Sequence, residues 1–258
     1  MDIEQPPRLD LADRALPGPL LRALRHVFHR PNPGCALVGG TALCGFYAGH
    51  RRSDDLDLFV RDRPSHEATI LTVRSLEGIG ARFEAENHRG PYYRAVCRLK
   101  DHFFTVDVVE DPALFRVGRF VELPDGVVVA DLETLLKMKS AALVSRCAEK
   151  DLYDLIWILE QVPGMSLERL VAFGAELDAG LNPESLLISV SGAQLRPGAC
   201  GFALDPAETP AAVHAQLEEF RQSLLHSLML LAKKQPVPPL GELIRRLRPR
   251  RGRRNGLE

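Results

Sequence analysis

Apolar and polar residues alternate along several short runs in the first half of the chain. In residues 55–60, Asp-Leu-Asp-Leu-Phe-Val, the regular alternation predicts a strand with one buried face. Other runs are rich in β-branched and aromatic residues and are bounded by turn residues, which is also typical of strands. The predicted strands are residues 35–38, 55–60, 81–86, 92–99, 103–109, 121–123 and 127–129.

Elsewhere, and throughout the second half, apolar residues recur every three or four positions, which predicts amphipathic helices. Thr41 is a candidate N-cap for one of them. Residues 186–203 fit a strand or a helix equally well. The predicted helices are residues 20–28, 42–49, 65–79, 131–147, 150–162, 167–178 and 213–233, with a short last helix after Pro239.

This order of elements predicts an α/β (α+β) fold with a mixed sheet, followed by a helical C-terminal half. A chain of 258 residues is long enough for one large domain or two modest ones. We expect an α/β core over residues 1–130 and a helical domain over residues 131–240. A basic and disordered tail is expected over residues 241–258.

Composition narrows the class of protein. Apolar residues make up 45% of the chain and charged residues 26%, as in ordinary soluble globular proteins. No apolar run approaches membrane-spanning length, and the acidic N-terminal stretch lacks the regions of a signal peptide. We therefore expect a cytoplasmic protein that binds no membrane. The five cysteines form no CxxC pair and the eight histidines no HExxH spacing, so we expect reduced cysteines and no structural zinc.

The net charge of −1 hides an uneven distribution. Residues 245–254 contain seven arginines and no acidic residue. Such a run is typical of a solvated, disordered tail, and it also fits an arm that attracts the phosphates of RNA or DNA. The two interpretations are compatible, because disordered basic tails often act through non-specific phosphate contacts.

One short stretch carries the strongest signal for chemistry. Gly39 and Gly40 form a tight turn before a predicted helix, and Asp55 and Asp57 follow on the next strand. Alternate residues of a strand share a face, so two carboxylates lie side by side, which is costly unless a cation lies between them. Magnesium prefers such oxygen ligands, and a glycine turn at a helix N-terminus can hold phosphate. Taken alone, each feature also fits an ordinary turn or a solvent-facing strand.

A third carboxylate stands in a different run. Asp107 interrupts the β-branched run of residues 103–109, and a charge there is expensive unless it is paired or binds a metal. It could be an edge-strand aspartate in a salt bridge. If its strand lies beside that of Asp55 and Asp57, three carboxylates converge, as two-metal phosphoryl transfer requires. The third carboxylate can also help to deprotonate an acceptor hydroxyl.

Basic residues follow in the helical half. Lys139, Arg146 and Lys150 are spaced to share one face of a continuous helix, and Asp154 comes four residues after Lys150. A basic face turned toward the carboxylates would bind a triphosphate. The alternative is a solvated face with an ordinary Lys150–Asp154 ion pair.

Together these motifs resemble the AbiEii/AbiGii toxin family. That family contains nucleotidyltransferases of the DNA polymerase β-like superfamily, which are the toxins of type IV toxin–antitoxin pairs. The resemblance implies a polymerase β-like nucleotidyltransferase fold. The motifs that carry it follow the family's order and are residues 38–43, 50–59, 106–108, 131–139 and 146–154.

The resemblance implies roles for the matched positions. Asp55, Asp57 and Asp107 would bind magnesium, with two ions expected, and would act in catalysis together with Lys139. Lys137 is an alternative to Lys139, because the alignment of that motif is blurred. The positions implied to bind the nucleotide are Gly39, Gly40, Thr41, Ser53, Arg146, Lys150, Asp151 and Asp154.

The predicted function is magnesium-dependent transfer of a nucleoside monophosphate from an NTP to an acceptor hydroxyl. By resemblance, the acceptor would be the 3′ end of tRNA or another RNA, and the partner a cognate antitoxin. The alternatives are transfer to a small molecule such as an aminoglycoside, transfer to a protein hydroxyl, or a non-catalytic nucleotide- or RNA-binding module. The intact Asp55, Asp57 and Asp107 argue against the last. Asp54 does not share the face of the pair and is expected to be dispensable.

Overall fold

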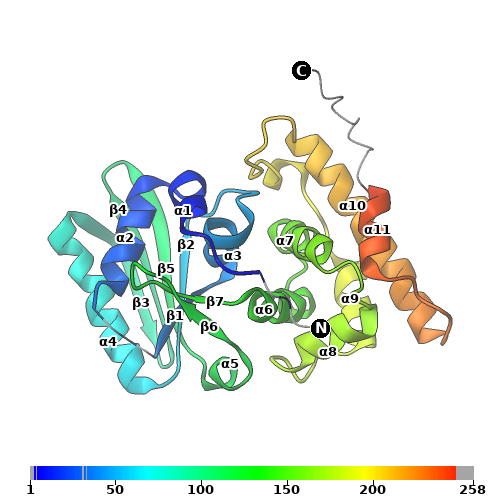
Figure 1. Ribbon diagram of the computed structural model, residues 1–258, viewed down its shortest axis with the longest axis horizontal. Coiled ribbons are helices and arrows are strands. Elements are labelled where there is room, and N and C mark those ends of the chain that lie inside the picture. Colours follow the sequence, from blue (N-terminus) through cyan, green and yellow to red (C-terminus); the bar gives the residue numbers. More distant parts are fainter. Residues whose placement is uncertain (1–2, 4, 31, 33, 248–258) are drawn as a thin grey trace.

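A mixed sheet and a group of helices form the two halves of the molecule (Figure 1). The computed structural model describes residues 3, 5–30, 32 and 34–247. In these residues the strands form one seven-stranded sheet in the order β3-β4-β5-β2-β1-β7-β6. The strands are β1 Cys35–Val38, β2 Asp55–Val60, β3 Ala81–Arg89, β4 Tyr92–Leu99, β5 His102–Glu110, β6 Phe120–Glu122 and β7 Val128–Ala130.

The pairing of the strands confirms the predicted mixed sheet. β2 lies antiparallel to β1 and parallel to β5, and β1 is also parallel to β7. β3, β4 and β5 form an antiparallel meander. Along β2 every second residue is buried, so Leu56, Leu58 and Val60 enter the core while Asp55 and Asp57 share the other face.

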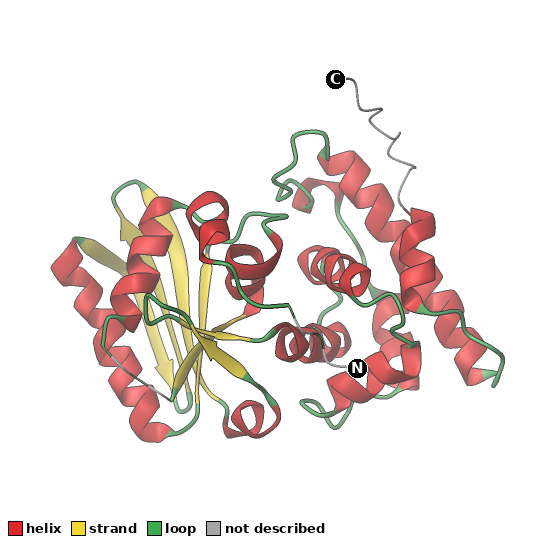
Figure 2. Ribbon diagram, in the orientation of Figure 1, coloured by secondary structure: helices red, strands yellow, loops and turns green. Residues whose placement is uncertain are grey.

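Helices cover the sheet and build the second half of the chain (Figure 2). α2 and α4 pack against β5 on one face of the sheet, and the helices from α6 onward gather beside it (Figure 1). Within the described part of the chain, no helix is both long and apolar enough to cross a membrane. The helices are α1 Leu9–Ala15, α2 Gly18–Phe28, α3 Gly39–Leu43, α4 Arg63–Arg74, α5 Pro112–Val117, α6 Leu132–Ser145, α7 Glu149–Gln161, α8 Leu167–Ala175, α9 Pro183–Gly192, α10 Pro210–Ala232 and α11 Leu240–Leu247. Shorter turns of helix are η1 Cys44–Ala48, η2 Ser75–Ile79 and η3 Pro197–Ala199.

Several boundaries differ from the prediction for identifiable reasons. The ambiguous segment of residues 186–203 is not a strand: it contains most of α9 and all of η3. α5 was not predicted, although Asp111 accepts a hydrogen bond from the Leu114 N–H and Pro112 stands at the first helical position. An aspartate cap followed by proline is a helix-start signal, so the sequence does carry a local signal for α5.

The end of the described chain is a helix rather than the start of a tail. α11 packs against α7 and α10 and buries Ile244 and Leu247, so the domain boundary placed at residue 241 falls inside a packed helix. Arg245 and Arg246 belong to this helix. The remaining arginines of the basic run lie in residues 248–258, which are outside the described residues.

Backbone contacts tie the two halves together next to β2. The Arg52 N–H donates to Phe202 O at 2.8 Å and the Leu204 N–H to His50 O at 3.0 Å. The Tyr47 hydroxyl donates to Ala130 O at 3.0 Å. The segment that leads into β2 is therefore held from both halves of the molecule.

Candidate active site

Asp55, Asp57 and Asp107 lie on neighbouring strands of the sheet. β2 and β5 are parallel, and their register places Asp57 opposite Asp107 and Asp55 opposite Thr105. Partners in register on adjacent strands project from the same face. The structure thus confirms that the strand of Asp107 lies beside that of Asp55 and Asp57. β5 lies between β2 and β4, so Asp107 is not on an edge strand.

Neighbouring side chains hold two of the three carboxylates. The Thr105 hydroxyl donates to Asp55 Oδ1. The Tyr92 hydroxyl donates to Asp107 Oδ1 at 2.6 Å, and Arg94 Nη1 lies 3.4 Å from Asp107 Oδ2. These contacts fix the side chains of Asp55 and Asp107 on the open face of the sheet.

The backbone of the glycine turn passes so close to this site that a side chain would not fit there. Gly39 has φ +69°, and a Cβ placed on it would lie 2.0 Å from Asp57 Oδ2. A Cβ on Gly40 would lie 2.5 Å from Arg51 Nη2. Only residues without side chains allow the backbone to run this close to a carboxylate and a guanidinium.

Thr41 has a different role from the predicted N-cap. α3 begins at Gly39 without a side-chain cap, and Thr41 lies inside it. The buried Thr41 hydroxyl donates to Asp55 O and lies 2.9 Å from Ser53 Oγ. Thr41 and Ser53 therefore fasten the glycine turn to the start of β2.

Replacing Gly39 by Ala is expected to disturb Asp57. The new methyl group meets Asp57 Oδ2 and the backbone φ is unfavourable, so we expect a loss of about 2–4 kcal/mol in unfolding free energy. The displaced carboxylate should lower the transfer rate about 100-fold. Gly80→Ala is the matched control, because Gly80 has φ +91° with open space around it. If both variants lose the same stability and activity in urea unfolding and transfer assays, the contact with Asp57 is irrelevant.

The electrostatics of Asp57 indicate a place for a cation. Burial, Asp55 and Asp107 together raise the pKa of Asp57 to about 6, and Lys139 and Arg146 oppose this rise. A divalent cation would remove the repulsion among the three carboxylates. Their oxygen atoms are the ligands that magnesium prefers, so the residues present fit this ion.

Behind this site lies a buried ionic cluster, formed by His50, Arg51, Lys139, Asp151 and Asp154. Arg51 donates to both oxygens of the fully buried Asp154, at 2.6 and 2.7 Å. Lys139 Nζ lies 2.7 Å from Asp154 and 2.8 Å from Asp151, and His50 Nε2 lies 2.9 Å from Asp154. Although burial opposes it, Lys139 and Arg51 hold the pKa of Asp154 well below its ordinary value.

This cluster changes how the matched aspartates are interpreted. Asp154 is paired with Arg51, and Asp151 with Lys139 and Arg146, so these two carboxylates hold the cations of the site in place. Despite burial, Asp154 and Asp151 raise the pKa of Lys139, which therefore stays charged. Arg51 and His50 were not predicted as site residues, although both stand in a matched motif.

The predicted continuous basic helix is wrong. α6 ends at Ser145, and Arg146 is extended, with φ −155° and ψ 112°. Arg146 nevertheless returns to the site, because its Nε donates to Asp151 at 3.1 Å. Lys150 is exposed on the first turn of α7, and Asp154 pairs with other residues instead of with it.

The structure distinguishes the two candidate lysines. Lys137 pairs with Glu133 and Glu176 and donates to Val117 O. Lys139 instead reaches the ionic cluster and lowers the pKa of Asp57. Lys139 is therefore the lysine that belongs to this site.

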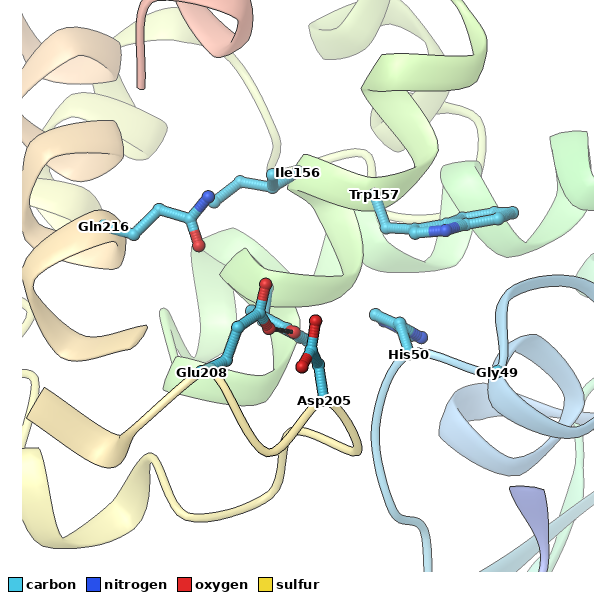
Figure 3. A pocket seen from close by; sticks show the side chains of 8 residues that line it. Gly49, His50, Ile156, Trp157, Asp205, Glu208 and Gln216 are labelled. Carbon is cyan, nitrogen blue, oxygen red and sulfur yellow. Dashed lines mark hydrogen bonds between the residues drawn. The ribbon is translucent and has the colours of Figure 1, made fainter. Parts of the chain in front are cut away.

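A cavity of about 200 Å³ is lined by His50 of the ionic cluster and by none of the three carboxylates. Figure 3 shows the side chains around it. His50 and Trp157 line it on one side, and Asp205 and Glu208 on the other. The Tyr153 hydroxyl donates to Glu208. His50 lines the cavity and also contacts Asp154, so it connects the two places.

Three ligand-type residues next to this cavity do not form a metal site. One atom each of Cys44, His50 and Asp154 lies within 4.8 Å of the others, and among the residues that the structure describes this is the one group of three that lies so close together. Asp154 already binds Arg51 and Lys139. Burial raises the pKa of the Cys44 thiol to about 12, so it stays protonated.

Comparisons with known proteins found distant similarities among solved structures. Among solved structures, MenT4, a nucleotidyltransferase toxin from Mycobacterium tuberculosis H37Rv, is 19% identical with a TM-score of 0.48, over 89% of this chain and 92% of that one. JHP933 from Helicobacter pylori is 19% identical with a TM-score of 0.45, over 83% of this chain and 93% of that one. No curated protein matches the chain.

A family match settles the assignment that these distant structures leave open. The family model described as "Nucleotidyl transferase AbiEii toxin, Type IV TA system" matches residues 22–225, which is most of the chain and includes all three carboxylates and the ionic cluster. The chain therefore belongs to the AbiEii family of nucleotidyltransferase toxins of type IV toxin–antitoxin systems.

Proposed function

We propose that this toxin transfers a nucleoside monophosphate from an NTP to a hydroxyl group of RNA, with the 3′ end of tRNA as the first candidate, and that the reaction requires magnesium. The observation that supports it most is the alignment of Asp57 with Asp107 across β2 and β5, with Asp55 on the same face. The family implies a cognate antitoxin as the partner of the toxin.

The three carboxylates are the proposed magnesium ligands. Two ions held there would stabilise negative charge on the attacking and leaving oxygens of the displacement. Asp107 is the proposed acceptor for the proton of the attacking hydroxyl. The hydroxyl oxygen then forms a bond to the α-phosphorus, the bond to the bridging oxygen breaks, and pyrophosphate leaves.

The triphosphate is proposed to lie on the side of β1 and the ionic cluster. The backbone of Gly39 and Gly40 and the Ser53 hydroxyl stand next to Asp57 and Arg51 there. Lys139 supplies a fixed positive charge, and Arg146, which is 70% exposed, can contact the leaving phosphates directly. Lys150 remains a proposed phosphate contact.

Other acceptors and a non-catalytic role are the competing functions. A small-molecule or protein hydroxyl would use the same carboxylates, so only the identity of the labelled product separates these acceptors. A nucleotide- or RNA-binding module would have no need for three carboxylates on one face, because their repulsion is a cost without a metal.

A labelling experiment tests the proposal. The purified chain is incubated with magnesium and each labelled NTP in turn, with total tRNA and then without it. Label on tRNA is the expected result, whereas label on a protein would assign a protein acceptor. Absence of label from both, with no difference between the wild type and Asp57→Asn, would contradict the enzymatic proposal.

The basic C-terminus gives a separate prediction. Truncation after Leu247 should weaken tRNA binding mainly at low salt, because each arginine lost removes a phosphate contact. It should leave the melting temperature unchanged. Truncation after Leu240 should also lower the melting temperature, since it removes the buried residues Ile244 and Leu247. Binding that is equal at every salt concentration for the chain ending at Leu247 would refute a role for the arm.

A further inference from the structure

The sheet has an open face beside the catalytic carboxylates. α4 and α2 cover the other face, where Tyr93, Ala95, Cys97 and Leu99 of β4 are buried. The alternating residues of β4 and β5 on the open face remain in contact with solvent to different degrees. These residues are Tyr92, Arg94, Val96, Arg98, Phe103, Thr105, Asp107 and Val109.

The strand register arranges this face in rows. One row runs from Arg94 to Asp107 and then to Asp57. Another runs from Arg82 through Arg98 to Phe103. Phe103 stands two residues before Thr105, a step of about 7 Å along the strand. Since Thr105 is opposite Asp55, Phe103 stands two residues along β5 from the row of Asp55 and four from the row of Asp57 and Asp107.

Phe103 is an unusual residue for an open sheet face. Its side chain is 56% exposed, while the next residue, Phe104, is buried in the core. The guanidinium carbon of Arg98 lies 5.6 Å from the centre of the Phe103 ring, and Glu84 holds that arginine at 2.9 Å. An exposed ring that is fixed beside an arginine offers a surface on which a nucleobase can stack.

Further arginines lie along this open face. Arg82 and Arg94 are exposed on the same face as Arg98, and Arg89 lies opposite Tyr92 at its edge. Glu84 offsets the charge of Arg98, and Asp107 offsets that of Arg94. The net positive charge of this face is complementary to the phosphates of an RNA backbone. The face leads to the three carboxylates, which the terminal hydroxyl of that RNA must reach.

The groups proposed to hold the triphosphate and the groups available to an RNA acceptor lie at different strands of the sheet. The groups proposed to hold the triphosphate, Gly39, Gly40 and Lys139, lie on the side of β1 and α6. The arginines lie on the opposite side of Asp107, on β4 and β3, and Phe103 lies on β5 itself, four residues before Asp107. An acceptor that occupies this second side meets Asp107 first, which is the proposed acceptor of its proton.

We propose that this face binds the single-stranded 3′ end of the RNA acceptor. A base stacks on Phe103, and backbone phosphates contact Arg94 and Arg98. The proposal rests on the transfer to RNA proposed above and names the surface which that acceptor uses. A base must be unpaired to present its flat face to Phe103, so a single strand is required.

Direct binding tests this surface independently of catalysis. The anisotropy of a fluorescein-labelled single-stranded RNA with a free 3′ hydroxyl is measured with the full chain, without NTP or magnesium. Phe103→Ala should weaken binding about tenfold. Arg98→Ala should also weaken it and should reduce the slope of log K against log salt by about one.

Matched controls come from the covered side of the molecule. Leu71 on α4 is 67% exposed and Arg22 on α2 is exposed, so Leu71→Ala and Arg22→Ala remove similar groups elsewhere and should bind like the wild type. Equal binding by Phe103→Ala and the wild type overturns the proposal, as does RNA affinity that falls equally in the controls. Melting temperatures of the Phe103, Leu71 and Arg22 variants should be unchanged, because these side chains are exposed. Arg98→Ala should lower the melting temperature only slightly, because it loses an ion pair with Glu84 at the surface.

The outcomes also separate this proposal from the proposed function. If Phe103→Ala loses RNA binding and the wild type transfers no label, the result supports the RNA-binding surface and contradicts the enzymatic proposal. Transfer to RNA at the wild-type rate and KM by Phe103→Ala supports the function and overturns the surface. Reduced labelling of a protein with unchanged RNA binding would mean that this face docks a protein.

Discussion

Replacing Asp154 by Asn should destabilise the fold by about 3–5 kcal/mol, the largest loss of stability that we expect from a single polar substitution. Asp154 is fully buried and balances Arg51 and Lys139 at 2.6–2.7 Å. An amide of nearly the same shape leaves these two buried cations without their counter-charge. Urea unfolding monitored by circular dichroism measures the loss.

A control on an exposed pair isolates the effect of burial. Glu67→Gln removes one partner of the Arg63–Glu67 pair, whose side chains are about half exposed, and should change stability by at most about 0.5 kcal/mol. A similar loss in both variants would mean that the buried cluster is no more important than a surface ion pair.

The pH dependence of Asp154 has a definite sign. Its pKa in the folded state lies well below its ordinary value, so the unfolded state binds the proton more readily. The stabilisation from Asp154 is complete above about pH 5 and is lost as the pH falls below the unfolded pKa of about 3.9. The Asp154→Asn variant should lack this part of the acid dependence.

Asp57→Asn should abolish nucleotide transfer, by about 1,000-fold or more, while making the protein without metal more stable. The carboxylate is a proposed magnesium ligand, so its loss removes stabilisation of the transferring phosphoryl group. Repulsion by Asp55 and Asp107 in a buried site makes the same carboxylate costly when no cation is bound. We expect a gain of about 1–3 kcal/mol at pH 7 in unfolding experiments with a chelator.

The pH dependence of Asp57 runs opposite to that of Asp154. Its folded pKa of about 6 lies above the unfolded value of about 3.9, so the folded state binds the proton more tightly. Wild-type stability in chelator should therefore fall as the pH rises from about 4 to about 6, and Asp57→Asn should lack this fall.

Asp54 supplies the control for both measurements. It lies three residues before Asp57, is 52% exposed and contacts His102 at 3.3 Å. Asp54→Asn should retain full transfer activity and stability within about 0.5 kcal/mol of the wild type. Equal loss of activity in both variants, or reduced stability in Asp57→Asn, would contradict the assigned role of Asp57.

The local pattern of the sequence was sufficient for the strands of the site. The alternation in residues 55–60 places Asp55 and Asp57 on one face, and the β-branched run around Asp107 marks its strand. That β2 and β5 are neighbours could be stated only as a condition, because pairing between distant strands depends on the whole sheet. The family resemblance, which the family match confirms, implied that these two strands are neighbours.

The ionic cluster could not be predicted from spacing along the chain. Arg51 and Asp154 are separated by 103 residues and meet only because the two halves pack together. Helical spacing therefore suggested the local Lys150–Asp154 pair, which the tertiary contacts replace. α6 ends two residues before the helix end predicted at residue 147. Propensity favours a continuing helix there, while the contact with Asp151 is made by the extended Arg146.

The backbone hydrogen bonds between residues 50–52 and 202–204 bear on whether this enzyme can be cut into two working fragments. A fragment ending at Ala130 would keep the three carboxylates and Arg51 but would lack Lys139, Asp154 and the strand-like partner of Arg51 at Ala203. The complementary fragment would contain the buried Asp154 without its partner Arg51. The change from sheet to helices near residue 130 divides the secondary structure, but each side holds charged groups whose partners lie on the other, so we expect neither fragment to keep the ionic cluster.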